Sequence, residues 1–459
     1  MSRFRPRSSP AVDVLAPSAP APALPRRPLP AQPAKLPSLT RTLPEVSPGA
    51  VARIGFWILC AYMVSGAVNE WALRLAGVKG YLSVVTLVSL PVVWLVCGAA
   101  FRGLRHSIGW WWAAFLALLL IATPFSIWRG GSVDLLVNYV PRTYMLFFYV
   151  VALTISFRNC RQLMYVNIAG SFMALLTCIA FGATSDDGRY MVPGGAGFFE
   201  NSNELAMQLL LGITQFVYLF SQKNRVGKLI AVSGIGLSIV YALRTGSRGC
   251  VIAAIAYILL LLYLTRHRVR VLLIITAVAA IGIMVSPTAA LHRLTLLFGD
   301  ETPSNSSELS AIASQMSRIA LLKRSVAETI AHPLFGVGPG QFPVAVMEEA
   351  KAKNEWFQYL GTHNSYTQIS SECGIPAFIC YCAAIALCLR LNFRIWKRFR
   401  DRRECADIAT LGVALLSGSV VYAVGSFFFH MAYSGTLPFL AGQTLALHFA
   451  AKRAIEQTK

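Results

Sequence analysis

Charged side chains are scarce in this chain. They make up 13% of its 459 residues, whereas about 25% is usual in soluble globular domains. Hydrophobic residues account for 56%, and several apolar runs are long enough to cross the roughly 30 Å hydrocarbon core of a bilayer as helices. The composition excludes an ordinary soluble domain and indicates an all-α, polytopic membrane protein.

Acidic residues are scarcer still, with 20 Asp and Glu against 41 Lys and Arg and a formal net charge of +21. In a soluble protein this excess would indicate a nucleic-acid partner. Here most of the cations fall in alternate short loops between the apolar runs, as the positive-inside bias requires. We therefore interpret the charge as membrane topology, with the lipid bilayer and not nucleic acid as the partner.

Clusters of metal ligands and paired cysteines are also missing. The ten cysteines are scattered through apolar runs or basic loops. None lies in the long polar loop at 286–362, so we expect no disulfide there. No Cys/His group has metal-ligand spacing, and we interpret the adjacent Asp186 and Asp187 as a solvated turn. We expect no metal and no cofactor.

The first 52 residues hold 12 of the 23 prolines, seven cations and almost no acid. Such a segment cannot bury enough apolar surface to fold, so residues 1–52 are predicted to be a disordered basic tail. No apolar h-region precedes Ile54, so we do not expect a signal peptide. Nine transmembrane helices are predicted within 53–285, and three more, with a short tail, within 363–459.

These apolar runs predict about twelve transmembrane helices in all. Their expected positions are 54–69, 80–101, 109–128, 139–157, 163–182, 203–221, 228–243, 249–265, 271–285, 367–389, 407–429 and 432–450. The loop at 390–403 alone carries seven cations, so we place it, and both termini, in the cytoplasm. The loop at 286–362 then lies on the outer side.

An amphipathic helix is predicted within this outer loop, because apolar residues recur there at spacings of three, four or seven. They are Leu309, Ile312, Met316, Ile319, Val326 and Ile330. Asn305 with Glu308 resembles a capping box, and Pro333 is expected to end the helix. We expect this helix to lie at the outer membrane interface, with Arg318 flanking its apolar stripe.

Two other outer turns carry polar residues. The turn LRTGSRG places Arg244 and Arg248 between the seventh and eighth predicted helices, and GGAGFFENSNELA places Asn201 and Asn203 at the start of the sixth. Arginines in such turns can bind substrate, but they also reach lipid headgroups without a catalytic role. Asn-Ser-Asn can equally be a helix cap. Both interpretations stay open for each turn.

A glycine-rich turn and a histidine end the outer loop. The turn FGVGPGQF contains the glycines at 336, 338 and 340, and HNSYTQISSECGIP begins with His363 and Asn364. Glycine permits close approach of the backbone to phosphate or glycan, although a plain loop also explains this turn. Histidine can act as a general base near neutral pH, although a helix-capping histidine is the simpler interpretation in isolation.

These motifs, in this order, resemble the O-antigen ligase and polymerase superfamily of bacterial envelope glycosyltransferases. The resemblance rests on TGSRG, on SRIALLKRSVAETIAHPLFGVGPGQF and on HNSYTQISSECGIP, and it covers roughly residues 190–390. It implies an enzyme of the bacterial cytoplasmic (inner) membrane whose active site is periplasmic and covered by the long loop. It also implies transfer of a glycan, without a metal, from a polyprenyl (undecaprenyl) diphosphate-linked oligosaccharide to a hydroxyl acceptor.

The resemblance also implies roles for three residues. The family's turn arginine falls on Arg248, its loop arginine on Arg318 and its histidine on His363. Pro376 follows where the family often has a second glycine, and Thr367 stands where leucine is common, which leaves the subfamily open.

Those roles suit the chemistry of the residues. Guanidinium groups bind a diphosphate in bidentate fashion and stabilise its developing charge, and His363 would activate the acceptor hydroxyl. Candidate supporting residues are Arg244, Asn364, Glu372, Gly336, Gly338, Gly340, Asn201 and Asn203. Asn364 would orient the base or a sugar, and Glu372, for which packing is the favoured role, is the alternative base. His292, His332, His430 and His448 lack such context and are interpreted as structural.

The acceptor stays open at this point. A ligase would use lipid A core, a polymerase would extend O-antigen or exopolysaccharide repeats on the lipid carrier, and a protein O-oligosaccharyltransferase would use Ser or Thr. Other polysaccharide assembly and export proteins are candidate partners. A transporter of envelope precursors would show two similar halves and a carboxylate near the bilayer midplane, and neither is visible. A non-enzymatic assembly scaffold is the remaining alternative.

The charge pattern generates a test of orientation. Single cysteines placed in the 286–362 loop should react with membrane-impermeant thiol reagents in whole cells, because that loop is predicted to be periplasmic. Cysteines placed in the N-terminal tail or the 390–403 loop should be protected until the cells are lysed. The reverse pattern of labelling would contradict the predicted orientation.

Overall fold

In a computed structural model, the described residues are 49–78, 80–185, 188–195, 199, 201–285, 306–354 and 360–456. All of them belong to the larger of two compact units, residues 38–459. Most of the predicted tail, Asp186 and Asp187, and Asn305 of the predicted capping box lie outside the described residues. The first described helix begins at residue 50, inside the segment predicted as tail.

The described chain is helical apart from one two-stranded hairpin of β1 (Ala183–Thr184) and β2 (Tyr190–Met191). A helix occupies each of the twelve predicted positions, which confirms the all-α prediction. They are α2 (Ala50–Ala76), α3 (Leu82–Val96), α4 (Ser107–Ala122), α5 (Arg129–Tyr139) with α6 (Leu146–Leu153), α7 (Phe157–Phe181), α8 (Ser202–Ser221), α9 (Arg225–Arg244), α10 (Arg248–Leu264), α11 (Arg268–Val285), α15 (Ser365–Phe399), α16 (Ala406–Gly425) and α17 (Thr436–Glu456).

Eight of the described helices are long and apolar enough to cross a membrane, and α3 and α10 are shorter apolar helices. The chain is therefore a multi-pass membrane protein, while the count of twelve spans stays a prediction. The helix predicted at 139–157 begins earlier than expected, at residue 129. It passes through a π-helical turn at Val140–Tyr144 into α6. The first part of this helix, α5, was not predicted because the polar residues Arg129, Asp134 and Asn138 interrupt the apolar run.

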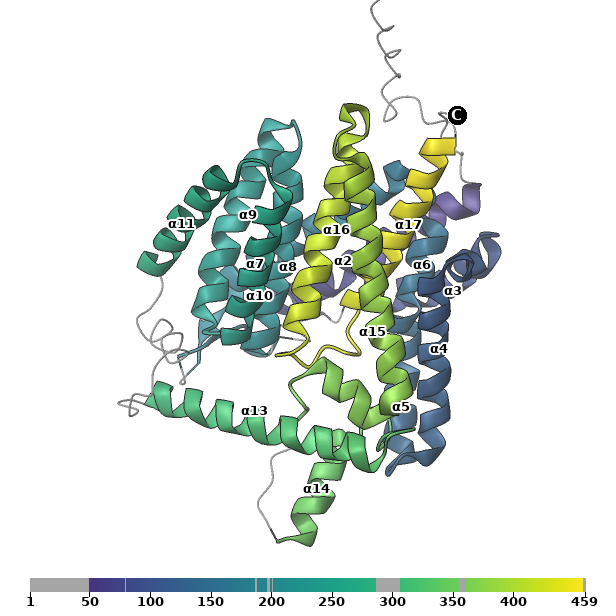
Figure 1. The fold of residues 1–459 in the computed structure, drawn as a ribbon, viewed down its shortest axis with the longest axis vertical. Coiled ribbons are helices and arrows are strands. Elements are labelled where there is room, and N and C mark those ends of the chain that lie inside the picture. Colours follow the sequence, from purple (N-terminus) through teal and green to yellow (C-terminus); the bar gives the residue numbers. More distant parts are fainter. Residues whose placement is uncertain are drawn as a thin grey trace, which may run out of the picture. The chain divides into compact units, whose positions relative to one another are not determined.

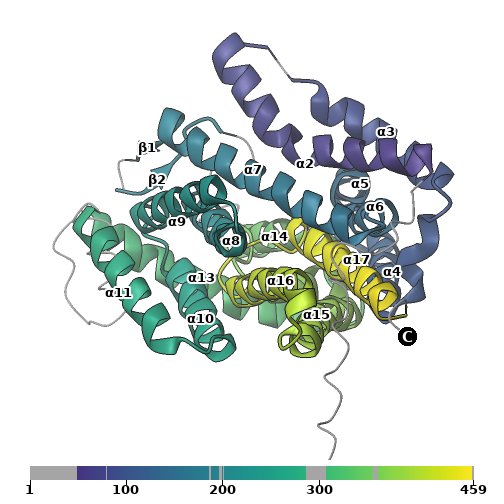
Figure 2. The ribbon, with the colours of Figure 1, turned by 90° about the horizontal axis from the view of Figure 1, so that it is seen from above.

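The helices pack side by side, with α15, α16 and α17 in mutual contact and α4 against α15 (Figures 1 and 2). A pair of aromatic residues joins α4 to the π-turn. Trp112 stacks on Tyr144 with ring centroids 5.2 Å apart, and each side chain donates a hydrogen bond to the other residue's carbonyl. Both side chains are buried. Each therefore contributes a large apolar surface to the core while its polar group is hydrogen-bonded.

The loop predicted at 286–362 contains two helices: α13 (Ser306–Ala331), which lies across one end of this bundle, and the shorter α14 (Phe342–Ala352), which projects beyond α13 (Figure 1). The predicted helix is confirmed, and it ends two residues before Pro333. The part of its apolar stripe from Met316 to Ile330 faces outward, with Met316 68% and Ile330 73% exposed. Its other side is fixed to the protein through Arg324, which pairs with Glu349 of α14, and through Thr329, whose hydroxyl bonds Ser370 of α15.

The glycine-rich turn docks onto a break in α15. Helical geometry is interrupted at Gly374, which has φ +83° and ψ 172°, just before Pro376. The N–H groups of Val337 and Gly338 donate to the carbonyls of Ser371 and Glu372, each at 2.9 Å. On the other side of the break, the Ile375 N–H donates to the Pro333 carbonyl at 2.8 Å. The turn thus satisfies backbone groups that the broken helix leaves free.

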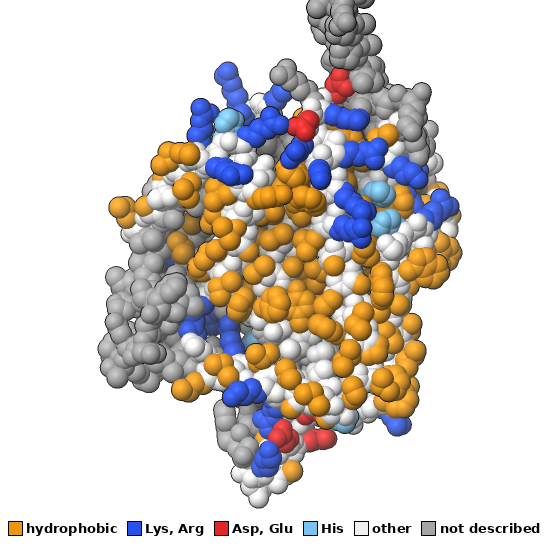
Figure 3. Space-filling model, in the orientation of Figure 1, with side chains coloured by type: hydrophobic (Ala, Val, Ile, Leu, Met, Phe, Trp, Pro, Cys, Tyr) orange, Lys and Arg blue, Asp and Glu red, His pale blue; other side chains and the backbone are white. Residues whose placement is uncertain are grey.

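The two ends of the bundle differ in charge. Figure 3 shows a broad belt of hydrophobic side chains, with most Lys and Arg at the end opposite α13. The belt is what lipid contact requires, and the asymmetry between the ends agrees with the alternation of cations along the sequence.

The docked turn generates a stability prediction. Gly336 has φ +63°, and a Cβ built there would lie 2.3 Å from the Glu372 carbonyl carbon. Gly336→Ala should therefore lower the free energy of unfolding by about 3 kcal/mol or more, measured by thermal or denaturant unfolding of the purified protein. The matched control is Gly236→Ala in α9, where no atom lies within 4 Å. Equal stability of the two variants would show that the turn is not held as described.

Candidate active site

His363 lies in the short segment that leads into α15. The next residue, Asn364, is the N-cap: its side-chain oxygen accepts hydrogen bonds from the N–H groups of Tyr366 at 2.9 Å and Thr367 at 3.2 Å. His363 has φ +50°, a left-handed conformation that few non-glycine residues adopt. Such strained positions concentrate at functional sites. Asn364 fixes the start of α15. The left-handed backbone of His363, the residue before the cap, sets the direction of its imidazole side chain.

Arg248 contacts α13 one helical turn from Arg318. Arg248 is the first residue of α10, and its Nη1 donates to the Gln315 side-chain oxygen of α13 at 2.7 Å. Arg318 lies one helical turn after Gln315 on the same helix. Burial lowers the pKa of His363 most, and the positive charge of Arg318 lowers it further. Arg248 is thus linked to α13 close to Arg318, and Arg318 acts electrostatically on His363.

Arg189 is a further member of this group, and the sequence analysis missed it. It immediately precedes β2, and its Nε donates to the carbonyl of Thr245 at 3.3 Å, within the TGSRG turn. Its charge also lowers the pKa of His363. The available signal was its place in a predicted outer loop, where cations are disfavoured. The same argument had drawn attention to Arg244 and Arg248.

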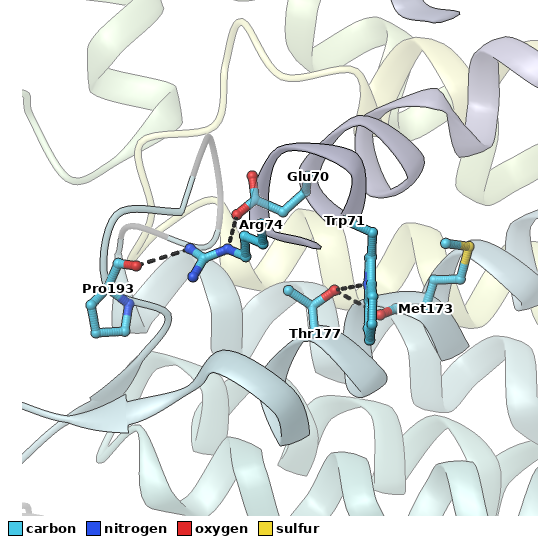
Figure 4. Close-up of polar contacts among 6 residues, drawn as sticks. All are labelled: Glu70, Trp71, Arg74, Met173, Thr177 and Pro193. Carbon is cyan, nitrogen blue, oxygen red and sulfur yellow. Dashed lines mark hydrogen bonds and ion pairs between the residues drawn. The ribbon is translucent and has the colours of Figure 1, made fainter. Parts of the chain in front are cut away.

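The loop that carries Arg189 is tied to α2 (Figure 4). Arg74 pairs with Glu70 through Nε at 2.6 Å and donates through Nη2 to the carbonyl of Pro193 at 2.9 Å. One turn away, the Trp71 indole N–H donates to the Thr177 hydroxyl of α7 at 2.9 Å. The Arg74 contact anchors the segment that follows β2, next to the hairpin that carries Arg189, and the Trp71 contact holds α2 against α7.

The electrostatics favour a neutral base beside an anion site. Burial lowers the pKa of His363 most, and the charges of Arg318 and Arg189 lower it further, to about 4. His363 is therefore uncharged at neutral pH and able to accept a proton. The guanidinium groups of Arg318 and Arg189 act on His363, and together with Arg248 they would bind a doubly charged phosphate group.

A second histidine lies next to this one. His430 is in the segment between α16 and α17, and His363 contributes to lowering its pKa, after burial, to about 4. Its Nε2 lies 3.0 Å from Nε2 of Gln368, whose side-chain oxygen accepts the N–H of Ala432. The Gln368 amide must therefore donate to His430, which occupies the Nε2 lone pair and leaves the proton on Nδ1. His430 is thus unsuited to act as a base, in contrast to His363.

Several candidate supporting residues have contacts elsewhere in the protein. Arg244 lies over the rings of Tyr190 at 4.6 Å and Tyr241 at 5.7 Å, so it braces the hairpin against α9. Asn201 caps α8 by accepting the N–H of Asn203 at 2.9 Å, and Asn203 itself is buried. Within the described part of the chain, no group of three or more His, Cys, Asp or Glu is placed to hold a metal ion.

The glycines and Glu372 belong to the docked turn. The close approaches that glycine permits here are to α15 at Gly336, to Ser126 at Gly338 and to Leu135 at Gly340. Glu372 is buried, and its Oε2 accepts hydrogen bonds from the Gly340 N–H at 2.9 Å and the Tyr433 hydroxyl at 2.7 Å. It lies nine residues beyond His363, about 13 Å along the helix. These contacts are those of an anchor for the turn.

Comparison with known families agrees with this grouping. Residues 233–382 match the family model described as O-antigen ligase. The matched segment includes the TGSRG turn, α13, the glycine-rich turn and the first half of α15, and hence Arg248, Arg318 and His363. Arg189 precedes it. A search of curated proteins finds no match to this chain.

The electrostatics generate a prediction about pH. Because the pKa of His363 is lowered to about 4, the neutral imidazole should persist until the pH falls to that region. The titration can be followed by NMR of isotopically labelled histidine, with His363→Gln to assign the signal. Arg189→Gln should shift the midpoint upward, since one repelling charge is removed, while Arg244→Gln should leave it unchanged. A midpoint near the ordinary 6.5 in the parent protein would contradict the description of the site.

Proposed function

We propose that this chain, whose residues 233–382 belong to the O-antigen ligase superfamily, moves a glycan from a polyprenyl diphosphate to a hydroxyl acceptor. The proposal is supported by the positive charges of Arg318 and Arg189 acting on a buried His363, and by the contact of Arg248 with α13 one helical turn from Arg318. Arginines for a diphosphate and a base for a hydroxyl are the two parts that this reaction requires.

The arginines act on the donor. As the bond between the sugar and the diphosphate breaks, negative charge grows on the departing phosphate oxygen. Guanidinium groups stabilise that charge through paired N–H donors. They come from three elements, namely the hairpin, the start of α10 and α13, so that the diphosphate would be held between parts of the fold that are fixed independently.

His363 acts on the acceptor. The acceptor oxygen forms a bond to the anomeric carbon as the diphosphate leaves, and its proton passes to the neutral imidazole. A histidine held neutral by burial and by nearby positive charge is a weaker base than free imidazole, but it is always in the form that accepts a proton. No step requires a metal, so transfer should proceed in the presence of a chelator.

The membrane supplies the donor's lipid. The exposed apolar stripe of α13 suits a helix that lies at the membrane interface, and Arg318 on the same helix would meet a diphosphate at headgroup depth. The polyprenyl chain would stay in the bilayer. We assign this end of the bundle to the periplasmic face because most basic side chains lie at the other end (Figure 3).

The products that the purified protein forms would identify its acceptor. Incubation with lipid-linked oligosaccharide alone should give no ladder of repeat lengths if the chain is a ligase, and addition of lipid A core should then yield glycosylated core. A ladder without added acceptor would instead identify a polymerase. No transfer under either condition would contradict the proposed function.

Because the arginines are proposed to bind the donor and His363 to activate the acceptor, variants of the two groups should lose different functions. Arg248→Ala, Arg318→Ala and Arg189→Ala should each weaken donor binding as well as turnover. His363→Ala should bind donor normally but lose turnover by about 10² to 10⁴, which is the usual contribution of a positioned general base. Replacing any of these arginines by lysine should restore little of the donor binding or turnover, because an ammonium group lacks the planar array of N–H donors of a guanidinium group.

Binding of polyprenyl diphosphate oligosaccharide and its transfer should be measured on the same preparations. Arg244→Ala is the matched control and should have the milder effect, because its guanidinium packs on Tyr190 and Tyr241. Transfer by His363→Ala at near the parent rate would exclude His363 as the base.

A further inference from the structure

A cavity lies between helices α8, α10, α15 and α16, near the end of the bundle opposite α13. Its volume is about 330 Å³, and its lining includes Val217, Tyr257, Trp396, Val413 and Ser417. A second, larger cavity of about 640 Å³ lies beside it, where α10 ends and α11 begins. Trp396 and Arg400 line both cavities, so the two are neighbours that share one wall.

The two cavities differ in character. The first is lined mainly by apolar side chains from four helices. The second is lined by Arg266, Arg268, Arg400 and Thr265. Asp401 pairs with Arg266 at 2.7 Å and with Arg400 at 3.2 Å, whereas no described residue forms an ion pair with Arg268. Three cations and one acid leave this second cavity positively charged.

Aromatic residues at the boundary between the two cavities indicate where the membrane surface lies. Tyr263, Phe393 and Trp396 form an aromatic group there, with Phe393 and Trp396 5.3 Å apart and Tyr263 6.4 Å from each. Arg400 lies over the Trp396 ring at 4.9 Å. Tryptophan and tyrosine gather at the level of lipid headgroups. The basic cavity is therefore at headgroup level, and the apolar cavity extends from it into the hydrocarbon region.

Three residues that line the apolar cavity, Tyr218, Tyr257 and Ser417, carry buried hydroxyl groups with no hydrogen-bond partner among the described residues. Tyr257 and Ser417 are 4% and 1% exposed, and neither the Tyr257 hydroxyl nor the Ser417 Oγ has a hydrogen-bond partner among the described residues. Leaving a buried hydroxyl unpaired costs stability. Tyr257 lies six residues before Tyr263 on α10, about 9 Å deeper along the helix, at a depth where the ester oxygens of a phospholipid could accept both hydrogen bonds.

We propose that these cavities form a binding site for one anionic phospholipid. Its phosphate lies among Arg266, Arg268 and Arg400, its glycerol esters accept from Tyr257 and Ser417, and part of an acyl chain occupies the apolar cavity. Basic pockets between transmembrane helices bind anionic headgroups in this way. Arg248 begins α10 and Leu264 ends it, so the site lies about 25 Å from the candidate active site and does not depend on the proposed function.

The experiment measures lipid binding by the full chain. The purified protein is delipidated, and binding of phosphatidylglycerol and of phosphatidylcholine is titrated by native mass spectrometry and by the shift in unfolding temperature. One phosphatidylglycerol should bind about ten-fold more tightly than phosphatidylcholine. Arg268→Gln and Arg400→Gln should each weaken it by about ten-fold, since each removes a charge-assisted contact with phosphate. Arg225→Gln, a basic position outside both cavities, is the matched control and should change nothing.

Tyr257→Phe separates a lipid contact from a structural role. It should weaken phosphatidylglycerol binding about three-fold, yet raise the unfolding temperature of the lipid-free protein, because an unpaired buried hydroxyl is removed. Ser417→Leu should fill the apolar cavity and abolish the selective binding. Inorganic phosphate and glycerol phosphate, which lack acyl chains, should not compete. Equal binding of the two lipids, insensitivity to all four variants, or competition by free phosphate would each overturn the proposal.

Discussion

The docking of the glycine-rich turn onto the broken helix α15 is the constraint on which the site depends. The helix loses its regular geometry at Gly374, and the turn at 336–340 makes main-chain hydrogen bonds to residues 371 and 372, while Pro333 just before the turn accepts one from residue 375. Glu372 adds a buried side-chain contact to Gly340. Because α13 precedes the turn and His363 precedes α15, this one junction sets the position of Arg318 relative to the histidine.

The same junction explains why the two most recognisable motifs occur together. The contacts that the glycines and the Glu-Cys-Gly-Ile-Pro sequence make with each other join the turn to α15. They hold the outer helices against the bundle, and they do so with backbone contacts that a Cβ atom would prevent at Gly336 and Gly374. Sequence motifs at an active site can thus record how the site is assembled as much as which residues react.

Much of the fold follows from apolar periodicity and charge placement. The twelve predicted helices, α13 with its end before Pro333, and the contrast in charge between the bundle ends were all predictable, because lipid imposes length and hydrophobicity on each helix. The early start of α5 was not, since its first residues include Arg129 and Asp134, whose tolerance depends on tertiary surroundings.

The site was predictable only in part. Arg248, Arg318 and His363 stood in motifs, whereas Arg189 is isolated in sequence and joins them only because the hairpin folds onto the TGSRG turn. His430 is close to His363 because residues 426–432 are bonded to the first turns of α15 through Ser365 and Gln368. Long-range contacts of this kind leave no periodic signal. The sequence leaves open whether the glycines approach phosphate or glycan or form a plain loop, and their contacts with α15 required the structure.

The most direct measurement of the central claim is the position of the donor in an experimental structure. The protein would be reconstituted in lipid nanodiscs with a polyprenyl diphosphate-linked oligosaccharide, using the His363→Ala variant so that the donor is not consumed. The account predicts density for the diphosphate between Arg189, Arg248 and Arg318, with the first sugar directed toward position 363. Density for the diphosphate elsewhere on the protein, with these three arginines unoccupied, would contradict it.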